Sequence, residues 1–351
     1  MKQMKIRQRG VTIGKLPVGP KNCITDVEGV QVGHVTLDHQ LQEGEHACTG
    51  VTAILPHGEN LFHQKVIGAS YILNGFGKTT GLVQVDELGV IEAPIMLTNT
   101  FGVPAVTQGT LAYMLKENPD IGVSTGTINI VVGECNDGRL NSIRELPVEP
   151  KHAIDAIQNA TSEASIEGAV GAGKGMICFG HKGGIGSSSR IVYDTSSDTA
   201  YTIGCMVLSN FGKKEEFQAE RYKAKEDSSV PSYPTPADGS IIIVLATDVP
   251  LGNSQLKRVA KRCGIGLGRT GSHFSNGSGD IVIAFSTAHK IPHVSENSVE
   301  PRSVLRDDHA VMNDLFQAAA EVTEEAIVNS LSQAVTTKGR LGETAYAYPF
   351  E

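Results

Sequence analysis

Tryptophan is absent from the 351 residues, and aromatic residues make up only 5% of the chain. Proteins that stack nucleic-acid bases depend on such rings, and the net charge of −8 also disfavours binding to a phosphate backbone. No apolar run is long enough to span a bilayer, and the basic first residues lead into no apolar signal segment. We therefore expect a cytoplasmic protein with no nucleic-acid partner and no membrane attachment.

Cysteine is scarce and scattered, with six residues and no pair at CxxC spacing. Disulfide scaffolds are short and secreted, so free thiols in the core are the better interpretation. The eleven histidines form no HExxH motif and no spacing typical of metal ligands. We expect no metal and no organic cofactor.

The chain is rich in apolar runs that predict strands, separated by clusters of its 39 glycines. Several runs are apolar almost without alternation, a pattern typical of strands that are covered on both faces. The predicted strands are Val51–Leu55, Ile91–Leu97, Ile128–Val132, Met176–Phe179, Ala200–Leu208, Ile241–Ala246 and Ile281–Phe285.

Helical spacing of apolar residues appears between these runs. Because strands and helices come in pairs rather than in strict alternation, we favour stacked sheets with helices outside over a doubly wound sheet. The whole chain, residues 1–351, is interpreted as one α/β domain. The predicted helices are Gly81–Leu88, Thr107–Lys116, Ala153–Glu167, Ser254–Leu267 and Ala310–Leu331.

Two segments differ from this pattern. Lys213–Ser232 is charged and almost free of aliphatic residues, which predicts a solvated loop or an exposed helix. The segment from Gly168 to Lys174 matches the GxxxxGK phosphate loop, but Gly175 stands where a serine or threonine would bind magnesium. It also follows a helix pattern, so a helix-ending turn is favoured. A non-catalytic phosphate- or nucleotide-binding protein remains the alternative from another class.

The junction between Gly239 and Ser240 joins the polar segment to an apolar strand. The Ser240 hydroxyl could attack the Gly239 carbonyl, and hydrolysis of the resulting ester would create a new amino terminus at Ser240. Such an α-amine has a pKa of about 7.7–8.0 and can serve as a general base near neutral pH. Asp-Gly-Ser is also a common turn sequence, so the tripeptide alone favours an ordinary turn.

The wider sequence resembles the DmpA-type L-aminopeptidase/D-esterase family, which includes the β-peptidyl aminopeptidases. The likeness extends over nearly the whole chain, and it is specific because many motifs occur in the same order. These motifs are Asn22–His34, Leu73–Gly77, Leu97–Thr100, Gly133–Gly138, Gly180–Arg190, Ala237–Asp248 and Ser275–Asp280.

The resemblance implies a role for several residues. Ser240 is the implied nucleophile, Asn210 the implied amide donor to the oxyanion, and Ser278 with Asp280 the pair that orients the proton path. Asp280 stands where at least some members have glutamate, so its reach is one methylene shorter. The resemblance also implies Arg139 and Asn99 as substrate-binding residues. Several relatives are expected to have tyrosine at the position of Arg139, which points either to a different substrate choice or to a side chain turned to solvent.

The resemblance implies a four-layer αββα sandwich that is self-cleaved into an α chain of residues 1–239 and a β chain of residues 240–351. It further implies homo-oligomers of these pairs and hydrolysis of small peptides, amino-acid amides or esters, including peptides of β-amino acids. The runner-up among enzymes is a self-cleaving acyltransferase of the ornithine acetyltransferase type. Those enzymes use threonine at the new terminus, and Ser240 counts against that alternative.

Overall fold

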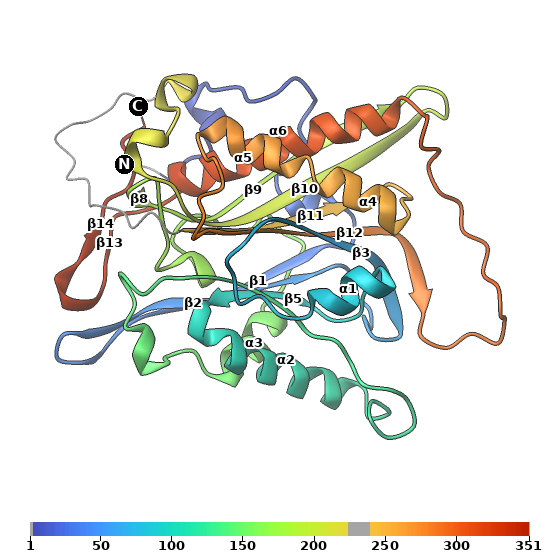
Figure 1. Cartoon of the computed structure of the whole chain (residues 1–351), viewed down its shortest axis with the longest axis horizontal. Coiled ribbons are helices and arrows are strands. Elements are labelled where there is room, and N and C mark those ends of the chain that lie inside the picture. The colour runs from blue at the N-terminus through green and yellow to red at the C-terminus, as the bar shows by residue number, and fades with distance from the viewer. Residues whose placement is uncertain (1–2, 224–238, 351) are drawn as a thin grey trace.

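The computed structural model describes residues 3–223 and 239–350 as two stacked sheets with helices on both outer faces (Figure 1). One sheet has four strands in the order β1-β2-β5-β6, and the other has six in the order β4-β3-β12-β11-β10-β9. The predicted αββα sandwich is therefore confirmed. The bounds are β1 Gln31–Gln42, β2 Glu45–Leu55, β5 Ile95–Asn99, β6 Val131–Cys135, β4 Val90–Ile91, β3 Gln64–Gly75, β12 Gly279–Pro292, β11 Ser240–Thr247, β10 Thr199–Asn210 and β9 Gly184–Asp194.

Helices α2 and α3 cover the four-stranded sheet, and α4, α5 and α6 cover the six-stranded one (Figure 1). Two short hairpins, β7 with β8 and β13 with β14, lie outside the large sheets. None of the described helices is long and apolar enough to cross a bilayer. The remaining bounds are α1 Leu82–Leu88, α2 Val103–Glu117, α3 Pro150–Gln158, α4 Asn253–Ala260, α5 Cys263–Thr270, α6 Val311–Ser332, β7 Ile177–Cys178, β8 His181–Lys182, β13 Thr337–Lys338 and β14 Thr344–Ala345.

Strand β11 shows why an uninterrupted apolar run is required at the centre of the sandwich. Ile241 and Ile243 pack toward the helices, whereas Ile242 and Val244 pack toward the other sheet. Successive side chains of a strand point to opposite faces, so a strand covered on both sides needs apolar residues at every position. Burying each of these side chains contributes about 1.5–3 kcal/mol to stability. The β11 register is therefore strongly held, and this fixes the location of its first residue, Ser240.

Helix α6 lies across β9 and β10 at very close range. A Cβ atom at Gly186 of β9 would stand 1.9 Å from the Ala326 carbonyl oxygen of α6, so only glycine fits at this crossing. Further along, the Ser330 hydroxyl of α6 lies 2.6 Å from the hydroxyl of Ser209, the residue before Asn210. The helix layer thus supports the end of β10 that faces the Gly239–Ser240 junction.

Several predicted bounds were wrong. The helix predicted over residues 153–167 ends at Gln158, and the one predicted over 254–267 is broken into α4 and α5. Strands β1, β3 and β9 were not predicted, since polar and small residues interrupt their apolar pattern. All six cysteines are buried and unpaired, as expected.

The two unusual segments also differ from expectation. Residues 168–174 do not end a helix but form a buried turn in which Gly168 pairs with Ile185 of β9, and Lys174 forms an ion pair with Asp38. Residues 213–223 are not uniformly solvated, because Phe217 is buried in the same hydrophobic core as the apolar residues of α6. The rest of the predicted polar segment, residues 224–232, lies outside the described residues.

Candidate active site

Ser240 is the first residue of β11 and lies between two neighbouring strand ends. It is paired with Asn210 of β10 on one side and with Gly279 of β12 on the other. By alternation its side chain shares the face of Ile242, which packs between the two sheets. The sheet therefore brings the predicted nucleophile and the predicted amide donor onto one face as directly opposed cross-strand neighbours.

The carbonyl oxygen of Gly239 is the focus of hydrogen bonding at the junction. The Ser240 hydroxyl donates to it at 2.7 Å, and the Gly279 amide donates to it at 3.2 Å. The same Gly279 nitrogen is 3.3 Å from the Ser240 Oγ atom. An amide that faces both the hydroxyl and the carbonyl oxygen is placed to stabilise negative charge on that oxygen.

Residue 239 must be glycine in this arrangement. A Cβ atom there would stand 2.5 Å from the Phe211 Cα atom and 2.7 Å from the Asn210 carbonyl oxygen. Both obstacles are backbone, so neither can move aside without disturbing β10. The tight fit holds the Gly239 carbonyl against the Ser240 hydroxyl.

The side-chain amide of Asn210 is held in one orientation. Its Oδ1 atom accepts from the Ile177 amide at 2.9 Å, and its Nδ2 atom donates to the Asn136 carbonyl at 3.0 Å. An amide nitrogen carries two hydrogens, so one remains for a further acceptor. In this structure the Gly239 oxygen takes its hydrogen bonds from Ser240 and Gly279 rather than from Asn210.

Ser278 and Asp280 form a buried pair beside this centre. The Ser278 hydroxyl donates to Asp280 Oδ1 at 2.6 Å, whereas Asp280 Oδ2 is buried without a hydrogen-bond partner among the described residues. Burial raises the pKa of Asp280 to about 6, an effect that the bond from Ser278 partly offsets. The backbone of Gly279, between the two residues, connects this pair to the Ser240 hydroxyl. A carboxyl group with such a pKa can change protonation state near neutral pH.

A cavity of about 410 Å³ opens beside Gly239. Arg139 lines it, and its guanidinium lies 3.9 Å from the Glu343 carboxylate. Asn99, by contrast, is not brought to this cavity: its buried amide caps the turn at Gly102 and donates to Thr49. The cavity is lined by Asn136, Gly138, Arg139, Ile143, Gly175, Ile177, Asn210, Phe211, Gly212 and Gly239.

Two features of the site were not predicted from the sequence. The first is the Gly279 amide, since a backbone donor leaves no signature beyond the glycine itself. The second is Glu134 of β6, a buried carboxylate that accepts from the Lys78 amide at 2.8 Å and from the Thr100 hydroxyl. A Cβ atom at Gly77 would have both Glu134 Oε1 and the Gly279 Cα atom within 4 Å, which places the carboxylate near the β12 side of Ser240. An acidic residue inside an otherwise apolar strand was the available signal.

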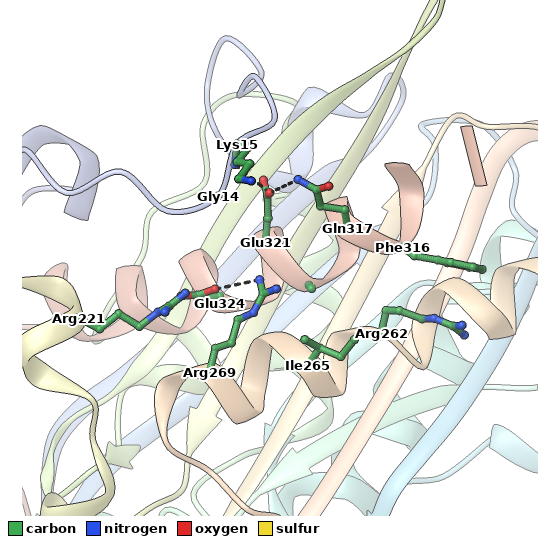
Figure 2. A pocket seen from close by; sticks show the side chains of 11 residues that line it. Gly14, Lys15, Arg221, Arg262, Ile265, Arg269, Phe316, Gln317, Glu321 and Glu324 are labelled. Carbon is green, nitrogen blue, oxygen red and sulfur yellow. Dashed lines mark hydrogen bonds and ion pairs between the residues drawn. The ribbon is translucent and has the colours of Figure 1, made fainter. Parts of the chain in front are cut away.

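A larger cavity of about 740 Å³ lies in the outer helix layer, between α5, α6 and the N-terminal segment (Figure 2). Arg221 and Arg269 both contact Glu324, as Figure 2 shows. Above them Glu321 accepts from Gln317 and from the Lys15 amide. None of the predicted site residues lines this cavity.

Comparison with known proteins identifies the family of this chain. The sequence profile of peptidase family S58 matches residues 22–345. The chain belongs to peptidase family S58. This membership makes it a hydrolase, and it disfavours both the acyltransferase and the nucleotide-binding alternatives.

Individual proteins match this chain over most of their length. The β-peptidyl aminopeptidase BapA of Sphingosinicella microcystinivorans is 38% identical, over 98% of this chain and 89% of that protein. The crystal structure of the PH0078 protein from Pyrococcus horikoshii OT3 is 47% identical with a TM-score of 0.91, covering 99% of this chain and 96% of the other. The L-aminopeptidase D-Ala-esterase/amidase of Ochrobactrum anthropi, described as a prototype serine aminopeptidase and an Ntn hydrolase fold variant, is 32% identical with the same TM-score and coverage. The chain therefore shares this fold.

Proposed function

We propose that this S58 peptidase is a serine aminopeptidase that matures by cutting its own Gly239–Ser240 bond. The observation that carries the proposal is the Ser240 hydroxyl held 2.7 Å from the Gly239 oxygen, with the Gly279 amide donating to that oxygen. The hydroxyl oxygen adds to the Gly239 carbonyl carbon, the carbon–nitrogen bond breaks, and the hydroxyl proton passes to the released amine. Water then hydrolyses the ester, which restores the Ser240 hydroxyl and leaves a carboxylate on Gly239.

Self-cleavage supplies the base that catalysis requires. The freed α-amine of Ser240 takes the proton of its own hydroxyl, which attacks the carbonyl carbon of a bound peptide. The Gly279 amide and the remaining hydrogen of Asn210 Nδ2 stabilise the oxyanion. The α-ammonium then protonates the leaving amine, and water releases the acyl group from Ser240. Ser278 and Asp280 orient the proton path through their buried hydrogen bond.

The proposed substrates are small peptides, amino-acid amides and esters with a free amino terminus. Peptides of β-amino acids are included, because BapA is named a β-peptidyl aminopeptidase. Glu134 is the carboxylate proposed to bind the substrate ammonium, since it lies close to the backbone of Gly279. The roles of Arg139 and Asn99 in substrate binding belong to the same proposal. Asn99 is proposed to act indirectly, since its side chain accepts a hydrogen bond from the Gly102 amide and so holds that turn in place.

The two chains produced by cleavage are proposed to stay together. Strands β11 and β12 come from the β chain, and they lie between β3 and β10 of the α chain in one sheet. Separating the chains would expose the apolar faces of these strands and break their backbone hydrogen bonds. A homo-oligomer of such pairs and a cytoplasmic location complete the proposal.

Intact mass analysis of the purified wild type and of Ser240→Ala tests the proposal. The wild type should yield two fragments that separate at residue 239, and Ser240→Ala should yield one intact chain without peptidase activity. Ser295→Ala, at an exposed serine, is the matched control and should behave as the wild type. An uncut but active wild type would contradict the mechanism.

A further inference from the structure

Lys182 of β8 is a fully buried lysine that is bonded to the backbone beside the active site. Its Nζ atom donates to the carbonyl oxygens of Gly173, Met176 and Gly183, each at 2.8 Å. An ammonium group has three hydrogens, so these bonds can use its whole donor capacity. Burying such a group without partners would be costly. The side chain therefore holds three points of the loop around a single atom.

One of the three bonds continues to the active site. The Met176 carbonyl and the Ile177 amide belong to the same peptide unit, which is planar and trans. Lys182 holds the carbonyl end of this unit, while the amide end donates to Asn210 Oδ1 at 2.9 Å. Because the unit is rigid, fixing its carbonyl also fixes the direction of its N–H bond. Lys182 is thus connected to the Asn210 side chain through one peptide unit.

We propose that Lys182 is a positioning residue for Asn210, the amide assigned above to the oxyanion. The inference rests on the proposed function and adds a residue that acts through Asn210. With Oδ1 bonded to the Ile177 amide, the Asn210 side chain cannot exchange its oxygen and nitrogen ends without losing that bond. Its Nδ2 atom therefore stays directed to the Asn136 carbonyl, and both asparagines line the cavity beside Gly239. Each bond in such a chain also polarises the next, which strengthens the final donor.

The local fold makes this peptide unit depend on Lys182. Ile177 and Lys182 are cross-strand partners in the hairpin of β7 and β8, which belongs to neither large sheet. One further backbone bond supports the unit, from the Gly183 amide to the Met176 carbonyl at 3.0 Å. A hairpin of this size is marginally stable by itself. The buried side chain of Lys182 therefore contributes much of what holds the Met176 carbonyl in place.

Either protonation state of Lys182 can supply the bond to Met176. Burial lowers the pKa of Lys182 to about 7. The neutral amine keeps two hydrogens, which are enough for the Met176 carbonyl and one other. The proposed role therefore depends on where the nitrogen atom is held rather than on its charge.

The first test is the effect of Lys182→Met on kcat and KM for alanine p-nitroanilide. Methionine is similar in length but donates no hydrogen bond. An oxyanion donor acts in the transition state, so displacing it should lower kcat and leave KM nearly unchanged. A misplacement of about 1 Å should lower kcat about 10- to 100-fold. A kcat within about twofold of the wild type in the folded variant would overturn the proposal.

A double-mutant cycle separates positioning from general damage to the core. Full-length chains labelled during cell-free synthesis start uncut, and fragment formation is followed in the wild type, Lys182→Met, Asn210→Ala and the double variant. Because Lys182 acts through Asn210, adding Lys182→Met to Asn210→Ala should slow self-cleavage by less than about twofold. A damaged core would slow both backgrounds equally, so equal losses in the two backgrounds would refute the proposal.

Two further variants sharpen the comparison. Lys174→Met is the matched control, since Lys174 is a nearly buried lysine of the same loop that pairs with Asp38. It should leave kcat within about twofold of the wild type, and a fall equal to that of Lys182→Met would assign the effect to the loop instead. Lys182→Gln keeps two donor hydrogens and should have an intermediate kcat. If Lys182→Met does not fold, Lys182→Gln takes its place in every arm and the same outcomes decide.

Crystal structures of Ser240→Ala chains separate this inference from the proposed function. With Lys182 present, Asn210 Oδ1 should remain 2.9 Å from the Ile177 nitrogen. With Lys182→Met added, the Asn210 side chain should turn and this bond should be lost. That result supports the inference even if the wild type neither cleaves itself nor hydrolyses peptides. An unmoved Asn210 side chain in the folded double variant refutes it.

Discussion

The cavity beside Gly239 and the larger cavity in the outer helix layer both have arginine and acidic residues nearby, but their polar groups are matched differently. In the larger cavity Glu324 accepts from Arg221, Arg269 and Tyr222. At the junction of Gly239 and Ser240, the Gly279 amide is shared between two oxygens, and one oxygen of Asp280 has no partner among the described residues. In the larger cavity the charged groups bond to one another. At the junction of Gly239 and Ser240, hydrogen-bonding capacity remains for a reacting group.

Because of this difference, the smaller cavity beside Gly239 is the better candidate for the active site. Buried carboxylates that are fully paired act as braces between elements, here between α6, α5 and the segment after β10. Buried polar groups that lack a hydrogen-bond partner lower stability, so they are expected where function requires them. Four substitutions test this distinction, and the expected loss of activation or unfolding free energy decreases from Asn210→Ala to Arg262→Gln.

Asn210→Ala should have the largest effect. Removing an oxyanion donor costs about 10²–10³ in kcat, and the self-cleavage rate should fall with it. Time courses of fragment formation and of peptide hydrolysis measure both. Asn313→Ala, at an exposed position of α6, is the control. Equal activity in Asn210→Ala and the wild type would remove Asn210 from the mechanism.

Asp280→Asn should change the pH profile of kcat/KM. Burial raises the pKa of Asp280 to about 6, so the ionised form that orients the proton path is lost as the pH falls through about 6. The wild type should therefore show a further fall in kcat/KM below pH 6, in addition to the fall at higher pH that protonation of the Ser240 α-amine, with a pKa of about 7.7–8.0, causes. Asp280→Asn should lack this acidic limb, at a rate lowered about 10²-fold by the loss of one proton-path group. A limb near pH 6 that persists in the variant would assign it to another residue.

Glu324→Gln tests whether the ion pairs in the larger cavity hold α6, α5 and the segment after β10 together. Hydrogen bonds to a charged group contribute about 1.5–3 kcal/mol, and the variant should lose stability of this order. Urea unfolding measures the loss, and kcat/KM of the folded variant should stay within twofold of the wild type. A variant of normal stability but low activity would show that this cavity takes part in catalysis.

Arg262→Gln should have the smallest effect. Its guanidinium lies 3.9 Å from the centre of the Phe316 ring, and such a contact at a partly exposed site contributes about 0.5–1 kcal/mol. The same unfolding experiment should show a loss of about this size. A loss of unfolding free energy as large as that of Glu324→Gln would mean that Arg262 also helps to hold these elements together.

Much of the core could be predicted from the sequence because its signals are local. The run Ile241–Ala246 predicts a strand covered on both faces, and β11 has that environment. Predictions from local signals were wrong where contacts with residues distant in the sequence determine the structure. Lys213–Ser232 seemed solvated by composition, yet Phe217 is anchored in the core by contacts with Phe179 and Tyr348, which lie far away in the sequence.

For the site, the sequence determined which residue types are present: a serine at the start of a core strand, an asparagine at the end of another, and a Ser-Gly-Asp triplet where a third begins. The pattern of side chains along a single strand is enough to place each of these residues relative to its own strand. Only the tertiary structure decided their mutual placement. The antiparallel pairing of β10 with β11 sets Asn210 opposite Ser240, and the parallel pairing of β11 with β12 turns the Gly279 amide toward the Gly239 oxygen. Register between strands distant in the chain is set by packing across the whole sandwich, and no local pattern encodes it.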